Sequence, residues 1–274
     1  MYTLPNAKIN IGLNVVSKRN DGYHDLQTVF YPIPLTDSLE LKDGSKWDDA
    51  CTLVLSGNKV EGRKEDNLVY RVFTSLQKEF NLPPTIIFLS KHIPTGAGLG
   101  GGSSDAASTM IMANEKFRLG LTDRDMEDRL SVFGSDCPFF VRNKPVYAEG
   151  RGNIFSDISV DLKGWYLLLV KPPVSVSTKE AYNGIRPAFP AVSLNESITS
   201  TPVEQWRGVI KNDFEPTVFL SHPQISAIKS TLYDMGAVYA SMSGSGSAVY
   251  GLFTFPIKNA QTIFPEAFVF TCQL

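Results

Sequence analysis

A glycine-rich segment that leads directly into a helical pattern constrains this 274-residue chain more than any other feature. Five of the seven residues at 96–102 are glycine, and the residues that follow, 103–113, have the alanine-rich, apolar composition of a buried helix. Glycine lets the backbone adopt positive φ and approach a ligand, while the first amides of a helix lack intrahelical partners and lie at the positive end of its dipole. The alternative, a flexible surface loop, fits less well because a strand-like run at 85–89 comes shortly before. The pattern predicts a phosphate-binding loop and a helix over about 103–117.

Bulk composition favours a globular protein that handles a small molecule. Apolar residues make up 43% of the chain, and the net charge of -2 comes without a long run of one sign, which argues against duplex nucleic acid or an acidic membrane as partner. The longest strongly apolar stretch, 165–170, is far below the ~20 residues of a membrane helix, and no apolar signal core opens the chain. We expect a cytoplasmic protein, and the sequence does not indicate its oligomeric state.

The three cysteines and three histidines show no pattern of their own. Cys51, Cys137 and Cys272 are odd in number and widely spaced, which indicates neither a disulfide framework nor a zinc site. Cys137 lies beside Asp136, but no histidine stands in a recognisable partner motif, so we expect a buried structural thiol rather than a nucleophile.

Hydrophobic periodicity predicts the elements of the first half of the chain. The residues around Asn20–Gly22 form a turn between two strands, Thr122 is a candidate N-cap, and Gly134 ends the helix that Thr122 begins. The expected ranges are strands at 6–16, 26–33 and 85–89, helices at 67–80 and about 122–133, and a short helix that starts within 135–138.

The second half is predicted with fewer elements. We expect a loop over the Pro-, Ser- and Thr-rich stretch 187–202, strands at 165–170, 237–240 and 248–253, and a helix at 226–235. Strands and helices mix without a regular βαβα order, which favours an α+β fold over a doubly wound parallel sheet. A boundary near 150–164 divides the chain into expected domains 1–155 and 156–274.

Three common phosphate-binding folds are excluded by what surrounds the glycines. A dinucleotide-binding fold needs the glycines directly after a strand and an acidic residue at the end of the next strand, but residues 90–95 intervene here and the acidic cluster 123–128 has a helical pattern. A P-loop would end in Gly-Lys-Ser or Gly-Lys-Thr, and a protein kinase would carry His-Arg-Asp and Asp-Phe-Gly; this sequence has none of them in place.

Three separated motifs resemble those of the GHMP kinases, the family named for galactokinase, homoserine kinase, mevalonate kinase and phosphomevalonate kinase. They are Ala7-Lys-Ile-Asn-Ile-Gly-Leu13, the run from Pro94 through the glycines to Ser104, and Met242-Ser-Gly-Ser-Gly-Ser-Ala248. Because the three motifs span nearly the whole chain in the family's order, the resemblance is specific. It implies the GHMP kinase fold, with two lobes and a ferredoxin-like C-terminal domain, and activity with ATP and Mg²⁺.

Two further blocks resemble one branch of that family, whose members phosphorylate the 2-hydroxyl of a cytidine diphosphate-linked methylerythritol in non-mevalonate isoprenoid biosynthesis. The blocks are 18–30, with Asp21-Gly-Tyr-His24, and 134–141, with Gly134-Ser-Asp-Cys-Pro138. The sequence departs from the pattern at Asn6, where proline is usual, and residues 174–240 match no motif. These departures leave the substrate contacts of the C-terminal part open.

The resemblance assigns the nucleotide to the glycine-rich segment and to Asn67. Read from the residues alone, Asn67 is a helix N-cap, and the serine pair caps the helix after the glycines. Ser104 is also a candidate Mg²⁺ ligand, with no glutamate clearly available as a second. The expected nucleotide-binding residues are Pro94, Thr95, Gly96, Ala97, Gly98, Leu99, Gly100, Gly101, Gly102, Ser103, Ser104 and Asn67.

The resemblance also assigns the chemistry. Phosphoryl transfer to a hydroxyl needs positioning, charge stabilisation and a carboxylate that accepts the proton. Read from the residues alone, Asp136 is more often an N-cap and Lys8 more often a solvated edge lysine, but the family places its catalytic aspartate and lysine at these positions. Lys8 would keep the carboxylate ionised and stabilise the transferred group. Asn10 would bind the reacting hydroxyl or a phosphate oxygen.

The same resemblance places the cytosine on Tyr23 and His24, which otherwise only flank a turn; a flat base can stack on the one and hydrogen-bond the other. Tyr182 is expected to supply the opposite stacking face. Two rival functions remain open: another metabolite kinase of the family, such as one for mevalonate or homoserine, and a catalytically inactive nucleotide-binding protein.

Overall fold

The computed structural model describes residues 1–45 and 49–274, which form two compact units. The first contains residues 1–7, 35–95 and 100–144, and the second contains residues 8–34, 96–99 and 145–274. The units therefore differ from the contiguous domains 1–155 and 156–274 expected from the sequence. The reason is that the long strand pair within 8–34 joins the second unit, where Leu13 forms a parallel bridge with Asn212.

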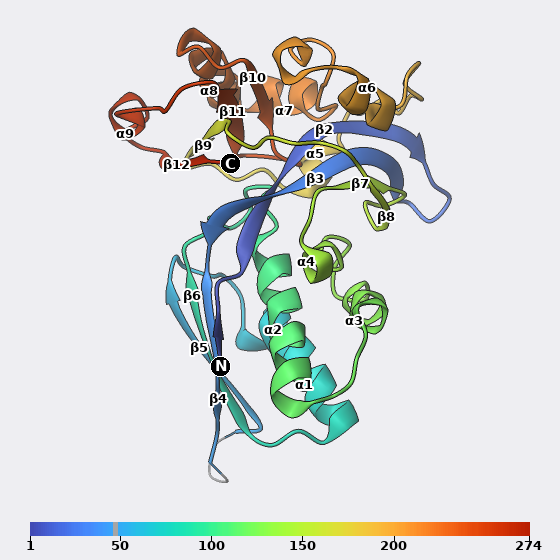
Figure 1. Cartoon of the computed structure of the whole chain (residues 1–274), viewed down its shortest axis with the longest axis vertical. Helices are drawn as coiled ribbons and strands as arrows, with labels where there is room; N and C mark the ends of the chain where they lie inside the picture. Colours follow the sequence, from blue (N-terminus) through green and yellow to red (C-terminus); the bar gives the residue numbers. More distant parts are fainter. Residues whose placement is uncertain (46–48) are drawn as a thin grey trace. The chain divides into compact units, whose positions relative to one another are not determined.

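A four-stranded sheet in the order β1-β4-β6-β5 is the base of the first unit. Its strands pair antiparallel except for β5 and β6, which are parallel. Helices α1 and α2 lie side by side along the sheet (Figure 1). The strands are β1 (Tyr2–Thr3), β4 (Ser38–Asp43), β5 (Cys51–Gly57) and β6 (Thr85–Lys91), and the helices are α1 (Leu68–Phe80), α2 (Gly101–Phe117), α3 (Asp123–Leu130) and α4 (Phe139–Arg142), with a 3₁₀ turn at Lys64–Asp66.

Local signals explain where these helices begin. The Asn67 side chain accepts a hydrogen bond from the Val69 amide at the start of α1, and Val69, Val72, Phe73 and Leu76 form its buried stripe. Thr122 caps α3 as expected, in a capping box with Asp125.

The second unit holds two four-stranded sheets. One has the order β2-β3-β7-β8, and the other has the order β10-β11-β9-β12 with helix α8 packed on β10 and β11. The strands are β2 (Asn6–Lys18), β3 (His24–Thr36), β7 (Val146–Glu149), β8 (Ile154–Asp157), β9 (Tyr166–Lys171), β10 (Tyr239–Met242), β11 (Val249–Phe253) and β12 (Phe268–Gln273). The helices are α5 (Thr178–Ala181), α6 (Leu194–Ser200), α7 (Glu215–Ser221), α8 (Pro223–Asp234) and α9 (Ala260–Ile263), with a 3₁₀ turn at Val203–Gln205.

The C-terminal sheet has the expected ferredoxin-like topology. Counted from β9, its strands run 2-3-1-4 across the sheet, all pairs are antiparallel, and helices lie in the chain between β9 and β10 and between β11 and β12. That is the split β-α-β arrangement. The α+β expectation is confirmed. Among the described residues no helix has the length and apolar character needed to cross a bilayer.

Several predicted boundaries are wrong. Helix α2 begins at residue 101 rather than 103, because Gly101 and Gly102 take helical φ. Helix α3 ends at Leu130 rather than 133, and a turn carries the chain from there to α4, which begins at Phe139. The stretch 187–202 is not all loop, since Ser193 caps α6 within it.

Candidate active site

In the glycine-rich loop, residues with a left-handed backbone conformation alternate with buried apolar residues. Gly96, Gly98 and Gly100 have φ of 60°, 74° and 70°, whereas Ala97 and Leu99 between them are buried. Gly100 is the N-cap of α2 and has no side chain with which to cap it. The alternation explains why glycine occupies every second position, and it brings the chain into the helix with its first-turn amides lacking intrahelical acceptors.

Gly101 and Gly102 are glycine for different reasons. A Cβ at Gly101 would lie 2.9 Å from Ile93 Cγ2 and 3.3 Å from Lys91 Nζ, so protein packing requires the absence of a side chain. A Cβ at Gly102 would meet nothing within 4 Å among the described residues, although glycine in a helix costs about 1 kcal/mol relative to alanine. Close approach of an anion to the first turn would account for a glycine that packing does not need.

We expect Gly102→Val to weaken binding of a non-hydrolysable ATP analogue by about tenfold or more, which is about 1.4 kcal/mol, because the side chain would project into the space in front of the helix amides. The melting temperature should change little, since the protein leaves room there. Calorimetric titration measures the affinity. Glu115→Val, at an exposed position near the other end of α2, controls for a β-branched residue in this helix. Equal affinities for both variants would remove the loop from the phosphate site.

The third glycine-rich motif contacts the first. The Ser243 hydroxyl donates to the Gly98 carbonyl at 2.8 Å, and Ala248 N donates to Ala97 O at 3.3 Å. A Cβ at Gly98 would overlap the Ser243 carbonyl oxygen. The first and third glycine-rich motifs are thus in direct contact.

Lys8 is buried rather than a solvated edge lysine. Its side chain is held on β2 with Nζ 2.5 Å from Asn10 Oδ1 and 3.1 Å from the Gly98 carbonyl oxygen, and 4.8 Å from the centre of the Phe30 ring. The residue is 3% exposed. A buried ammonium held against the glycine loop is suited to act on a bound anion.

Both polar atoms of the Asn10 side chain hydrogen-bond other residues of the protein. Its Oδ1 accepts from Lys8, and its Nδ2 donates to Thr28 Oγ1 at 2.9 Å, while Thr28 in turn donates to the Gly12 carbonyl. Asn10 is 2% exposed. This geometry makes Asn10 a residue that orients Lys8, and its contact with the reacting hydroxyl or a phosphate oxygen stays a prediction.

Asp136 lies in the turn before α4, where it is half-buried. The helix begins at Phe139 with Pro138 at the cap position, so Asp136 is not its N-cap. The neighbouring Cys137 is fully buried, and burial raises the pKa of its thiol to about 11 while a hydrogen bond from Ser103 opposes this. Cys137 is therefore a neutral structural thiol at physiological pH, as the sequence indicates.

The two serines after the glycines differ in exposure, and Asn67 has a structural role. Ser104 is 1% exposed, whereas Ser103 is half-buried. Asn67 is the predicted N-cap of α1. Among the described residues no three His, Cys, Asp or Glu side chains cluster so as to hold a metal ion.

The three aromatic residues predicted for the base are not arranged as a sandwich. His24 stacks directly on Tyr182, with ring centroids 4.5 Å apart and planes 16° from parallel, which leaves no space for a third ring between them. Tyr182 also meets the edge of Phe214. Tyr23 is 57% exposed, with the Arg151 guanidinium 4.8 Å from its ring centre. Tyr182 therefore supports His24 in this structure instead of facing it across a base.

The surroundings of His24 favour the neutral form of its imidazole. Burial lowers the pKa of its imidazole, and the nearby Lys18 ammonium lowers it further. A neutral imidazole has one donor and one acceptor, which matches the edge of a pyrimidine.

The sequence did not predict a buried ion cluster that joins strand β6 to helix α2. Lys91 on β6 forms ion pairs with Asp37 and, at 2.6 Å, with Asp105 of α2, and none of the three side chains is more than 4% exposed. Burial opposes the charge on Lys91, but the two carboxylates outweigh it and raise the pKa of its ammonium. Burial raises the pKa of Asp105 to about 7, and its Oδ1 has no hydrogen-bond partner among the described residues. The cluster ties helix α2 to the sheet.

Asn212 and Glu215 were also missed. They follow one another closely in Asn212-Asp-Phe-Glu215, within the region where no motif was matched, and they hydrogen-bond the strand end before the third glycine-rich motif. Helix α7, which begins at Glu215, was not predicted either, so the sequence carried no signal for these two residues.

Comparison with known proteins identifies the family. Residues 67–144 match the model for the GHMP kinase N-terminal domain, and residues 201–269 match the model for the C-terminal domain. A protein of Bacteroides fragilis named 4-diphosphocytidyl-2-C-methyl-D-erythritol kinase is 51% identical over 274 residues, covering 100% of both chains. A protein of the same name from Bacteroides thetaiotaomicron is 53% identical over 253 residues, covering 92% of each chain.

Solved structures agree with these matches. A crystal structure of 4-(cytidine 5'-diphospho)-2C-methyl-D-erythritol kinase superimposes with a TM-score of 0.82 at 29% identity, covering 99% of this chain and 98% of that one. Mevalonate kinase from Methanococcus jannaschii, at 16% identity, has the same fold, with a TM-score of 0.67 and coverage of 100% and 98%. Because both family domains match and full-length relatives are about half identical, this chain belongs to the GHMP kinase family.

Proposed function

We propose that this chain is the ATP-dependent kinase that phosphorylates the 2-hydroxyl of 4-diphosphocytidyl-2-C-methyl-D-erythritol, a step of non-mevalonate isoprenoid biosynthesis in the cytoplasm. The observation that carries the proposal is the 51% identity over the full length to a relative named as that kinase. The buried lysine, the left-handed glycine loop and the Asp-Gly-Tyr-His turn support it from within the chain.

In this proposal residues 94–104 bind the phosphates of ATP and Asn67 borders the adenine. The amides of the first turn of α2 donate to phosphate oxygens, and the dipole of this 17-residue helix favours their charge. Mg²⁺ would enter with the nucleotide, held by its phosphates and the Ser104 hydroxyl, and would neutralise charge between the β- and γ-phosphates.

Asp136 is the proposed general base and Lys8 the electrostatic residue. The Asp136 carboxylate accepts the proton of the 2-hydroxyl as that oxygen attacks the γ-phosphorus, the bond from the γ-phosphorus to the bridging oxygen breaks, and ADP leaves with the electron pair. Lys8, oriented by Asn10 and Gly98, stabilises the negative charge on the transferred group.

The cytosine is proposed to stack on Tyr23 and to hydrogen-bond the imidazole of His24, which Tyr182 supports from behind. We expect Tyr23→Ala and His24→Ala each to raise KM for the cytidylated substrate by about tenfold, since a stacking or edge contact is worth about 1–3 kcal/mol. The affinity for ATP should not change. Steady-state kinetics with each substrate varied in turn measures both. Normal KM for the cytidylated substrate with weakened ATP binding would show that the pockets are assigned the wrong way round.

Two other functions are separated from this one by a single assay. Release of ADP is measured with MgATP against the cytidylated erythritol, mevalonate and homoserine. The proposal predicts turnover of the first alone. Turnover of mevalonate or homoserine would assign the chain to another activity of its family, and ATP binding without any turnover would indicate an inactive nucleotide-binding protein.

A further inference from the structure

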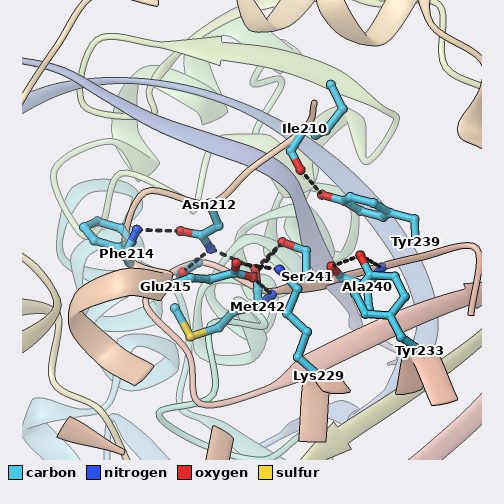
Figure 2. A network of polar contacts seen from close by, with 11 residues as sticks. Ile210, Asn212, Phe214, Glu215, Lys229, Tyr233, Tyr239, Ala240, Ser241 and Met242 are labelled. Atoms are coloured by element: carbon cyan, nitrogen blue, oxygen red, sulfur yellow. Dashed lines mark hydrogen bonds and ion pairs between the residues drawn. The ribbon is translucent and has the colours of Figure 1, made fainter. Parts of the chain in front are cut away.

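A buried polar network holds the strand end that leads into the third glycine-rich motif (Figure 2). Asn212 lies before α7 and is 2% exposed. Its Nδ2 donates to two backbone carbonyls, those of Met242 and Gly244, both at 2.8 Å, and its Oδ1 accepts from Phe214 N at 3.0 Å. The amide thus uses both donors and an acceptor, and it bridges the residues on either side of Ser243.

Glu215, the first residue of α7, fixes the same strand end through its carboxylate. Its Oε1 accepts from Met242 N at 2.9 Å and from the Ser241 hydroxyl at 3.3 Å. Its Oε2 accepts from Lys229 of α8 at 2.6 Å, which supplies the opposite charge for a side chain that is nearly buried. A buried carboxylate that accepts from two neutral donors and one cation is a rigid attachment point.

Ser243 links the third glycine-rich motif to the glycine loop and to β2 through hydrogen bonds. Its hydroxyl donates to the Gly98 carbonyl at 2.8 Å and accepts from Asn10 N at 3.1 Å. The Lys8 ammonium donates to the same carbonyl and to the Asn10 side chain. Gly98 and Asn10, which orient Lys8, are therefore both hydrogen-bonded to Ser243. The residues beside Ser243 are in turn held by Asn212 and Glu215.

We infer that Asn212 and Glu215 are positioning residues for phosphoryl transfer: through Ser243 they set the places of Gly98 and Asn10, and so the position of the Lys8 ammonium. The inference rests on the proposed function for the role of Lys8. A displacement of about 1 Å at a reacting group can cost about 10² in rate, so residues that act only through Ser243 can control turnover.

The test compares three variants. Asn212→Leu removes both donors at nearly constant volume, and Glu215→Gln is a milder change that keeps an acceptor for Met242 N while losing the ion pair with Lys229. Tyr233→Phe is the matched control. It also removes hydrogen bonds to the backbone of β10, but at Ala240, which lies outside the motif.

We expect kcat to fall about 10- to 100-fold in Asn212→Leu and by less in Glu215→Gln, with little change in KM for the cytidylated substrate. Hydrogen exchange should be faster in residues 96–99 and 242–248 of both variants. Tyr233→Phe should lower the melting temperature while leaving kcat and those exchange rates as in the wild type. If Asn212→Leu does not fold, Glu215→Gln alone decides the outcome.

Wild-type exchange in 96–99 and 242–248, or faster exchange with wild-type kcat, would overturn the inference. Failure of the proposed function would look different, because the unaltered protein would then turn over none of the cytidylated substrate. In that case the exchange measurement, which needs no substrate, still shows whether the two residues hold the motif.

Discussion

Asp136→Asn should lower kcat by about 10²–10⁴ with little change in the affinity for either substrate, because the variant keeps the size of the side chain and loses the proton acceptor. A purely structural Asp136 predicts otherwise, since an amide can replace most hydrogen bonds of a carboxylate. The residue is half-buried in a turn and does not cap α4, so the asparagine variant should keep the melting temperature. Near-normal turnover would refute the assignment as general base.

Lys8→Met provides the partner measurement. Removing the buried ammonium should lower kcat by about 10²–10³, the loss typical of one electrostatic donor in an active site. If Asp136 and Lys8 act as one unit, the double variant should be impaired much less than the product of the single losses. Strictly multiplicative losses would mean that the two residues act independently.

Lys91→Met should be the most destabilising single change in the first unit, lowering the free energy of unfolding by about 3–5 kcal/mol and Tm by about 6–20 °C. It leaves the carboxylates of Asp37 and Asp105 buried without a cation. Lys42→Met is the control: it removes a lysine from the same sheet, but one whose ion pair with Glu40 is exposed, and it should change Tm little.

The loss should also depend on pH. Asp105 already has its pKa raised to about 7 by burial, and removal of Lys91 raises it further. A carboxyl whose pKa is raised on folding contributes stability below its unfolded pKa and loses it as pH rises through the folded pKa. The difference in Tm between wild type and Lys91→Met should therefore be larger at pH 8.5 than at pH 6. At pH 8.5 it should reach the full decrease of about 6–20 °C. A difference that is small and independent of pH would contradict this account of the cluster.

Motifs that act through their own backbone or local periodicity were predictable. The ferredoxin-like order of the C-terminal sheet agrees with what the family resemblance implies, and no local signal predicted it. The glycine loop and the Asn67 and Thr122 caps agree with expectations from the residues themselves. Each depends on residue types whose conformational or capping preference is strong enough to be read in a short window.

Features built by contacts between distant segments were not predictable. Lys91 meets Asp37 and Asp105 across 54 and 14 residues, and Asn212 meets Met242 and Gly244 across 30 and 32. No periodicity links such residues, and a lone buried lysine or asparagine looks like a surface residue in a single sequence. The direct stacking of His24 on Tyr182 was missed for the same reason, since a sequence that suggests two rings does not give the space between them.

The most direct test of the proposed activity is the position of the new phosphate. The protein is incubated with MgATP and 4-diphosphocytidyl-2-C-methyl-D-erythritol labelled with ¹³C at carbon 2, and the product is followed by NMR. The account predicts stoichiometric formation of ADP and a new coupling between the carbon 2 resonance and phosphorus. Phosphate on another carbon, or ADP formation with the labelled substrate unchanged, would contradict it.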